Sequence, residues 1–261
     1  MKTLIEAFKD NLKVSSLSVT QINQYLRCPV QWEFRYVKGI KIPPAGAMLQ
    51  GRVYHETYAE NFKQKIQTLV DLPITDLADI YANCWDKEIV QNTEFSFSEI
   101  LWDEEPSKAK DEGFSLVKLY RELVAPQVIP KEVEVKINKV LASNIEMTGR
   151  LDLVDDQDII IDHKVSKRSQ SQETVDRDLQ ASVYLWLKDS SRFQFHRVVN
   201  KKQKEVQILG TTRTEEQLRR VVNMILKTHS LMQTGIVPPR CDSFWCSKAF
   251  CGYFETCKAR I

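Results

Sequence analysis

The chain has 261 residues, enough for one large domain or two modest ones, and 43% of them are apolar, which suffices for a sizeable core. Its net charge of +2 is close to neutral, so charge alone gives no argument for a polyanionic partner. No apolar run approaches the roughly 20 residues of a membrane span, and the charged N-terminal segment lacks the apolar core of a signal peptide. We therefore expect a cytoplasmic protein that does not enter a membrane.

The N-terminal part of the chain is predicted to be helical. Residues 1–13 suit a short helix, and Ser18 or Thr20 is positioned to cap the helix that follows. Pro29 permits a new helix to begin, because a first helical turn leaves its N–H without a partner in any case. This places Cys28 at a junction between two helices, where its sulfur can face outward.

A long helical region comes next. A helix is predicted to begin near Met48 and to carry His55 in its early turns. Residues 56–126 have a mostly helical pattern, with a less regular stretch at 92–106. Cys84, which follows an apolar helical pattern, is interpreted as a buried thiol that acts as a small apolar side chain.

The hydrophobic period changes at Lys131. Residues 132–140 alternate strictly between polar and apolar, as a half-buried strand does. A turn near residues 143–144 leads to a second strand over 145–154, and a third strand reaches Lys164. We expect these three strands to be antiparallel.

The hairpin from Gly149 to Lys164 brings together two acids and a lysine. Residues i and i+2 of a strand point to the same face, so Asp162 and Lys164 project together, and the partner strand can bring Asp152 beside them. Two carboxylates and an amine at the end of an apolar hairpin are costly to hold together unless something binds there. Because hard cations take carboxylate oxygens, the hairpin predicts a divalent metal site.

The rest of the chain alternates between helices and strands. A helix over about 174–188 carries Gln180 and Tyr184 four positions apart, so their side chains share a face. Two strands, 193–199 and 205–209, and a long amphipathic helix complete the pattern. The order of elements predicts a protein of the α/β class.

The six cysteines are concentrated at the C-terminal end, with four in the last 21 residues. Thiolates in sets of four bind zinc or an iron–sulfur cluster, and a reducing cytosol favours such roles over disulfides. Zinc ribbons use closely spaced CxxC pairs, which this tail lacks, so its aromatic-rich spacing fits a cluster better. Two ligand sets remain open: the four tail cysteines, or three of them with Cys28. The tail cysteines are Cys241, Cys246, Cys251 and Cys257.

Together these features resemble the PD-(D/E)XK nuclease superfamily, in particular the RecB-like exonucleases that carry an iron–sulfur cluster. That group includes the AddB nuclease domain and the CRISPR-associated adaptation exonucleases. The resemblance covers most of the chain and rests on segments in the family's order: SVTQINQYLRCP, GRVYHE, GRLDLVDD, IIIDHK and QASVYLW, followed by the cysteine tail. The chain departs from many relatives in having Asp162 in place of Glu, a wider tail spacing, and the additional Cys241.

The resemblance implies one nuclease domain over residues 1–261. Its fold would be a restriction-endonuclease-like α/β core with a mixed central sheet flanked by helices. Residues 56–126 would form a largely helical insertion, and residues 236–261 an iron–sulfur tail joined to the N-terminal region. The implied ligands of the [4Fe-4S] cluster are Cys28, Cys246, Cys251 and Cys257.

The resemblance also assigns roles at the hairpin. His55 becomes a further ligand of Mg²⁺ or Mn²⁺, with Asp152, Asp162 and the backbone carbonyl of His163. The side chain of His163 points away from Asp162, so we do not expect it to be catalytic. Glu134 is a weaker candidate, interpreted as part of a solvated strand face.

The remaining implied roles concern the substrate. Lys164 would orient the attacking water or stabilise the transition state electrostatically. Gln180 and Tyr184 would position the nucleic-acid strand.

The implied function is a metal-dependent DNA exonuclease that acts on free or single-stranded ends, in recombination, repair or phage DNA processing. Two alternatives are an end-processing nuclease of the CRISPR-adaptation type and a non-catalytic DNA-binding module of a recombination complex. DNA is the expected substrate, and a recombination or annealing protein is a further expected partner.

Overall fold

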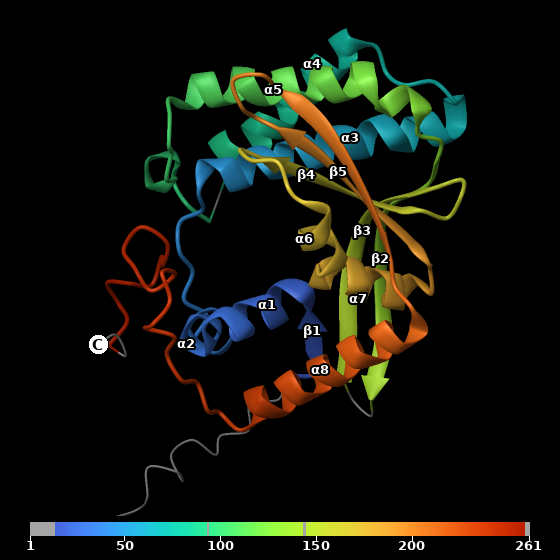
Figure 1. Ribbon diagram of the computed structural model, residues 1–261. Helices are drawn as coiled ribbons and strands as arrows, with labels where there is room; N and C mark the ends of the chain where they lie inside the picture. The colour runs from blue at the N-terminus through green and yellow to red at the C-terminus, as the bar shows by residue number, and fades with distance from the viewer. Residues whose placement is uncertain (1–13, 93, 143–144, 259–261) are drawn as a thin grey trace, which may run out of the picture. The chain divides into compact units, whose positions relative to one another are not determined.

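The computed structural model describes residues 14–92, 94–142 and 145–258, so the helix predicted over 1–13 and the turn at 143–144 lie outside the described residues. The chain divides into two compact units, which are described separately below (Figure 1). The first unit comprises Met1–Ile42, Asn138–Gly149 and Glu215–Ile261. The second comprises Pro43–Ile137 and Arg150–Thr214.

The described strands form a mixed sheet in the order β1-β3-β4-β5-β6, with β2 paired to β3. Two pairs of neighbouring strands are antiparallel: β3 with β4, and β5 with β6. Two other pairs are parallel: β1 with β3, and β4 with β5. This confirms the predicted mixed sheet. The strands are β1 (Ser16–Ser18), β2 (Pro130–Ala142), β3 (Ile145–Asp155), β4 (Ile160–Ser166), β5 (Arg192–Val199) and β6 (Glu205–Thr212).

The helices follow the sequence pattern closely, and none in the described part of the chain is both long and apolar enough to cross a membrane. Short π-helical turns extend α2 and α4 at Glu33–Val37 and Asp86–Val90. The helices are α1 (Val19–Arg27), α2 (Pro29–Trp32), α3 (Gly46–Thr68), α4 (Ile74–Trp85), α5 (Pro106–Leu123), α6 (Gln172–Asp176), α7 (Leu179–Lys188) and α8 (Glu215–Gln233).

One predicted helix is divided in the structure. The prediction of a continuous helix over 174–188 is wrong, because α6 and α7 are separate. The Asp178 carboxylate accepts a hydrogen bond from the backbone N–H of Ala181, at 2.9 Å, and so forms the N-cap of α7. An N-cap residue has an extended backbone, which ends the preceding helix.

In the first unit, the predicted junction between α1 and α2 is confirmed. Ser18 caps α1 by accepting from the backbone N–H of Gln21. Cys28 has an extended backbone; it is the C-cap that follows α1 and the N-cap that precedes Pro29, the first residue of α2.

The core of the second unit is unusually aromatic. Helices α3, α4 and α5 pack together and against the strands of this unit, and α6 and α7 contact β6 and β5 (Figure 1). Cys84 is buried in this core, as expected. The largest of the fully buried side chains here are Tyr54, Tyr58, Phe62, Tyr81, Tyr120, Phe193 and Phe195.

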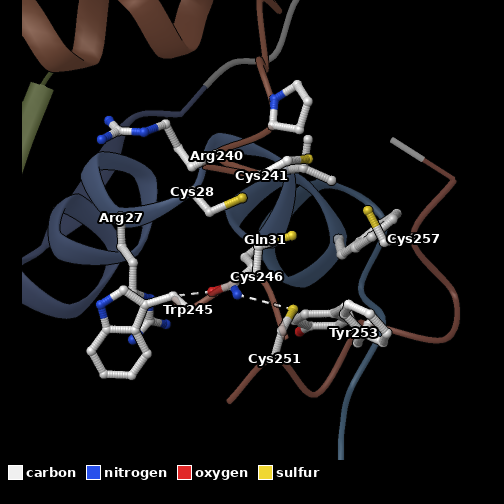
Figure 2. Close-up of a pocket in the computed structure, with 14 residues that line it drawn as sticks. Arg27, Cys28, Gln31, Arg240, Cys241, Trp245, Cys246, Cys251, Tyr253 and Cys257 are labelled. Carbon is white, nitrogen blue, oxygen red and sulfur yellow. Dashed lines mark hydrogen bonds between the residues drawn. The ribbon is translucent and has the colours of Figure 1, made fainter. Parts of the chain in front are cut away.

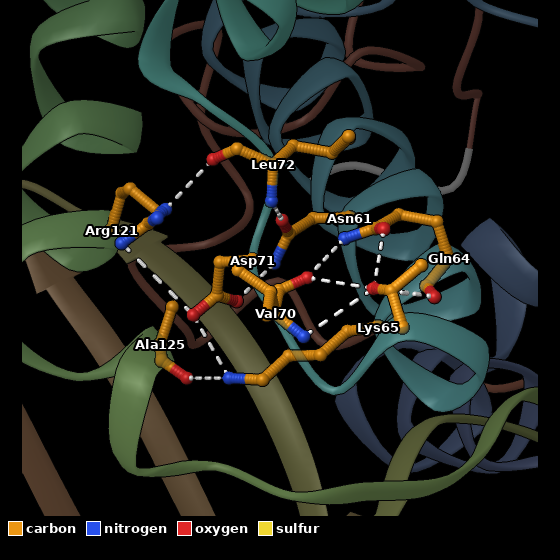
Figure 3. Close-up of polar contacts among 9 residues, drawn as sticks. Asn61, Gln64, Lys65, Val70, Asp71, Leu72, Arg121 and Ala125 are labelled. Carbon is orange, nitrogen blue, oxygen red and sulfur yellow. Dashed lines mark hydrogen bonds and ion pairs between the residues drawn. The ribbon is translucent and has the colours of Figure 1, made fainter.

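A buried polar cluster joins the end of α3 to the segments around it (Figure 3). Lys65 Nζ lies 2.9 Å from Asp71 Oδ2 and donates to the Ala125 carbonyl at 2.7 Å. Asn61 donates to Asp71 Oδ1 and accepts from the backbone N–H of Leu72. Because every charge in the cluster has a partner, the cluster can be buried without a large penalty.

Substitution of Lys65 by methionine is expected to lower the free energy of unfolding by about 1.5–3 kcal/mol, because it removes a buried, charged hydrogen-bond partner of Asp71 and leaves Arg121, whose Nη1 atom lies 4.0 Å from Oδ2, as the counterion of that carboxylate. Chemical denaturation measures this change. Lys63→Met is the control: Lys63 pairs with Glu60 at the surface, and its loss should cost less than about 1 kcal/mol. Equal losses for the two variants would contradict a stabilising role for the cluster.

Candidate active site

An open cleft of about 680 Å³ lies in the second unit, and five elements contribute to it: α3, the π-helical turn Asp86–Val90, β2, β3 and β4. One face of α3 forms a side of the cleft at intervals of four residues: Ala47, Gly51, His55, Ala59 and Lys63. Residues four apart on a helix share a face, so the small residues of this row leave His55 accessible between them. Strands β2, β3 and β4 supply the opposing side chains Glu134, Asp152 and Lys164.

Asp152 is held by two donors. Its Oδ2 atom lies 3.0 Å from Nδ1 of His55 and accepts a hydrogen bond from the backbone N–H of His163 at 2.8 Å. Burial would raise the pKa of Asp152, but His55, with His163 and Lys164, outweighs burial and holds that pKa well below its usual range. Burial would likewise lower the pKa of His55, but Asp152 raises it above its usual value. The two groups therefore behave as an ion pair.

Asp162 is buried, with a relative exposure of 2%. Its Oδ2 atom lies 2.6 Å from Nζ of Lys164, and its Oδ1 atom accepts from Nε2 of Gln180 at 2.7 Å. Burial raises the pKa of Asp162 to about 6, although Lys164 opposes this effect. Burial would lower the pKa of Lys164, but Asp162 raises it. The predicted proximity of Asp162 and Lys164 is confirmed.

The α7 helix covers the side of the sheet that carries Asp162. Gln180 contacts Asp162 directly, and Tyr184, one turn later, hydrogen-bonds to Gln180 and is nearly buried. Burial raises the pKa of Tyr184 to about 12. The prediction that Gln180 and Tyr184 lie on one face of the helix is confirmed, and this face of α7 is turned toward Asp162.

The side chain of His163 lies on the other side of the sheet, as expected from strand alternation. Its ring stacks on Tyr58 and Phe62, at centroid separations of 5.8 Å for both. Burial lowers the pKa of His163 to about 3, so the ring is neutral.

The interpretation of Glu134 as part of a solvated strand face is wrong. Its side chain is only 14% exposed, forms an ion pair with Arg150 and lines the cleft. Its φ of 55° lies in the left-handed region, which residues other than glycine adopt rarely and often at functional sites. Burial, with Asp152 nearby, raises the pKa of Glu134. Nothing in the alternating sequence of β2 signals this local change of direction.

The first unit contains a second candidate site. Cys28 and all four tail cysteines line one cavity (Figure 2). The thiol of Cys246 hydrogen-bonds with that of Cys241, and burial, followed by this neighbour, raises the pKa of Cys246. Gln31 donates to Sγ of Cys251 at 3.1 Å. None of the six cysteines, all within the described residues, is in a disulfide.

The donor atoms at the two sites are not arranged as a closed metal site. Among residues 14–92, 94–142 and 145–258, no three His, Cys, Asp or Glu side chains surround one point as metal ligands do. At the cleft the reason is visible, because Oδ2 of Asp152 is paired with His55 and Oδ2 of Asp162 with Lys164. The chemistry of the donors nevertheless suits hard cations at the cleft and soft, thiolate-binding centres at the cysteines.

Comparison with known proteins identifies the family. The model of the PD-(D/E)XK nuclease superfamily matches residues 16–258, a range that includes both sites. No curated protein matches the chain. A crystal structure of a candidate exonuclease from Eubacterium rectale has a TM-score of 0.58 at 13% identity, over 92% of this chain and 88% of that one, which shows a similar fold. The crystal structure of SSO0001 is less similar, with a TM-score of 0.45 at 13% identity over 98% of this chain and 93% of that one. Because the family model spans nearly the whole chain, the protein belongs to the PD-(D/E)XK nuclease superfamily.

Proposed function

We propose that this nuclease is a metal-dependent deoxyribonuclease that hydrolyses phosphodiester bonds from free or single-stranded DNA ends. The observation that carries the proposal is the convergence of His55, Asp152, Asp162 and Lys164 in the second unit. The similar fold from Eubacterium rectale, described as a candidate exonuclease, supports action at ends.

The proposed ligands of Mg²⁺ or Mn²⁺ are His55, Asp152, Asp162 and the backbone carbonyl of His163. Carboxylate and carbonyl oxygens suit these hard cations. When bound, such an ion polarises the scissile phosphate and lowers the pKa of a bound water. Glu134 borders the same cleft and would keep Arg150 directed toward the substrate through their ion pair.

Lys164 is the proposed catalytic cation. Its ammonium group reaches the cleft while contacting Asp162, so it can orient a water or stabilise the charge that develops on the phosphate. Gln180 holds Asp162 in place from behind, and Tyr184 supports Gln180. We propose that these two residues also position the nucleic-acid strand.

Metal binding is expected to release protons near pH 6. Asp162 has a folded-state pKa above its unfolded value, so its protonated form stabilises the metal-free protein, and this stabilisation is lost as the pH rises through about 6. A bound cation requires the ionised form, and it also requires neutral His55. The affinity for Mn²⁺ should therefore fall steeply between pH 7 and pH 5. Calorimetry in buffers of different ionisation enthalpy measures the released protons; an affinity that is constant over this range would contradict ligation by Asp162.

We propose further that Cys28, Cys246, Cys251 and Cys257 hold a [4Fe-4S] cluster that joins the tail to the α1–α2 junction. The support is the cavity that these thiols share and the apolar side chains that surround it. A cluster of this kind would have a structural role, because it closes a very long loop of the chain.

We propose that the enzyme works in the cytoplasm, within one nuclease domain formed by both units. Its setting would be recombination, repair or phage DNA processing, with a recombination or annealing protein as partner. End processing of the CRISPR-adaptation type is the alternative setting.

The decisive assay uses end-labelled single- and double-stranded DNA, blocked at either end, with Mg²⁺ or Mn²⁺. We expect cleavage that requires the metal and an unblocked end, and circular DNA should survive. Cleavage of circular DNA would refute the exonuclease assignment. Tight DNA binding without cleavage in either metal would refute the enzyme and favour a non-catalytic DNA-binding module.

A further inference from the structure

Three aromatic side chains of the cysteine tail form a patch on the surface of the first unit. Phe244, Trp245 and Phe250 are 65%, 37% and 57% exposed, respectively. Their ring centroids are separated by 4.6, 5.5 and 5.6 Å, so each ring contacts the other two. Single exposed apolar residues are common on proteins, whereas a contiguous apolar patch marks an interaction site. These three residues are called the aromatic patch below.

The part of the first unit that carries the aromatic patch is rich in positive charge. The guanidinium group of Arg27 lies over the Trp245 ring, 5.3 Å from its centroid (Figure 2). Residues 14–42 and 236–258, which together line the cysteine cavity, contain seven Lys or Arg and only three Asp or Glu. This surplus exceeds the net charge of the whole chain, which is +2, so the remainder of the chain is net negative.

Some of these cations have acidic neighbours within the tail. Arg240 lies 3.7 Å from Asp242, and Lys248 lies 3.1 Å from Glu255. All four side chains are more than half exposed. Ion pairs between exposed side chains contribute little stability, so either cation can exchange its carboxylate for a phosphate at low cost.

Exposed aromatic rings beside cations are the features that bind single-stranded nucleic acid. Unpaired bases stack on the rings, while the cations contact the phosphate backbone. In a duplex the bases stack on one another and present only their edges, so a set of exposed rings selects an unpaired strand. A second copy of this chain is a poorer occupant, because it would bring the same surplus of positive charge against the patch.

The segment that carries the aromatic patch is anchored on both sides. Before the patch, the hydroxyl of Tyr25 in α1 donates to the Ile236 carbonyl at 3.0 Å. After the patch, the hydroxyl of Tyr253 donates to the Ile40 carbonyl at 2.9 Å. A binding surface that is held in place beforehand loses less conformational entropy when its ligand arrives.

We propose that the aromatic patch binds an unpaired segment of a DNA strand, with bases stacked on its rings and the backbone held by the neighbouring cations. The patch is a DNA-binding surface of the first unit, additional to the cleft of the second unit. It goes beyond the proposed function, because it uses neither the proposed metal ligands nor Lys164.

Combined changes in the protein and in the DNA isolate the stacking contribution. Phe244→Leu with Phe250→Leu removes two exposed rings and retains Trp245, which lines the cysteine cavity. The ligands are an oligothymidine and the same backbone without bases. We expect the double variant to bind oligothymidine at least about 10-fold more weakly than the wild type, and to bind the abasic strand equally well. Fluorescence anisotropy of end-labelled strands, without divalent metal, measures both affinities.

The control is Phe97→Leu, because Phe97 is 45% exposed but belongs to the second unit. It should leave both affinities within about two-fold of the wild type, a change far smaller than the loss of a stacked base. Circular dichroism and thermal unfolding of the double variant check its fold. Unchanged binding of oligothymidine by the double variant, or equal weakening for the two strands, would overturn the proposal.

Ultraviolet cross-linking locates the strand directly. Thymine bases stacked on aromatic side chains become covalently joined to them, and mass spectrometry identifies the modified residues. We expect cross-links at Phe244, Trp245 or Phe250. Cross-links that are absent or confined to other segments would count against the patch. Self-association of the DNA-free protein that is lost in the double variant would assign the patch to a second copy instead.

The outcomes separate this proposal from the proposed function. If the wild-type protein cuts no DNA in either metal but the patch still contributes base-dependent affinity, the nuclease assignment fails and the patch stands. If the wild-type protein cuts DNA and the double variant binds oligothymidine as tightly as the wild type, the patch fails and the nuclease assignment stands.

Discussion

Substitution of Lys164 by alanine is expected to reduce the rate of DNA cleavage by about 10²–10³-fold or more, the usual effect of removing a group that stabilises transition-state charge. Lys164 is the cation whose ammonium group both lines the cleft and contacts the buried carboxylate of Asp162. The loss should appear in the catalytic rate rather than in the affinity for DNA, because developing charge exists only in the transition state. Single-turnover cleavage of an end-labelled oligonucleotide measures it.

The matched control is Lys167→Ala, on the segment just after β4. Lys167 is exposed and pairs with Asp103 at the surface, so its removal should leave the rate within a few-fold of the wild type. A folded Lys164→Ala variant with full activity would refute the catalytic assignment. Circular dichroism and Mn²⁺ binding, measured on both variants, separate a catalytic loss from a structural one.

The parts of this site that could be predicted from sequence are those set by local geometry. Strand alternation alone places Asp162 with Lys164 and turns His163 to the other face. Helical spacing alone puts Gln180 and Tyr184 together. In each case the relevant residues lie within one turn or one strand, so tertiary packing has little opportunity to change the outcome.

The features that sequence reasoning missed depend on distant contacts or on a single backbone angle. β1 is only three residues long, which is too short for a periodic hydrophobic pattern to predict it. It forms through pairing with the distant β3, as between Ser16 and Glu146. Glu134 reaches the cleft through a left-handed φ within an alternating strand. Tyr120 meets His163 across 43 positions of sequence, and each is an ordinary core residue in its own segment.

At the cysteine site, too, the local sequence predicts one part of the site, and contacts between distant residues determine the rest. The density of thiols in the tail predicts a ligand set, but spacing alone left Cys28 and Cys241 as competing members. The structure brings both to the same cavity as the other three. Cys246 hydrogen-bonds with Cys241, whereas Cys28 is only a weaker charge neighbour of Cys246, so contact with Cys246 alone favours Cys241.

Single serine substitutions are expected to separate these two cysteines. Cys28→Ser, like Cys246→Ser, should abolish the brown colour and broad visible absorbance of the anaerobically purified protein, because four thiolates are needed to hold the cluster. Cys241→Ser should retain the colour and the iron content, since the tail would remain joined to Cys28. Iron and sulfide analysis of each variant measures cluster occupancy.

The backbone conformation around each residue also favours Cys28 over Cys241 as the fourth ligand. Cys28 has an extended backbone between two helices, each of which fixes one of its neighbours, whereas Cys241 follows Pro239 and Arg240 in a segment of turns. A ligand whose backbone is already fixed loses less conformational entropy when it binds. Bleaching by Cys241→Ser together with full colour in Cys28→Ser would reverse the assignment and confine the cluster to the tail. A colourless wild-type protein loaded with zinc would refute the cluster, and the same pair of substitutions would then identify the zinc ligands through metal content.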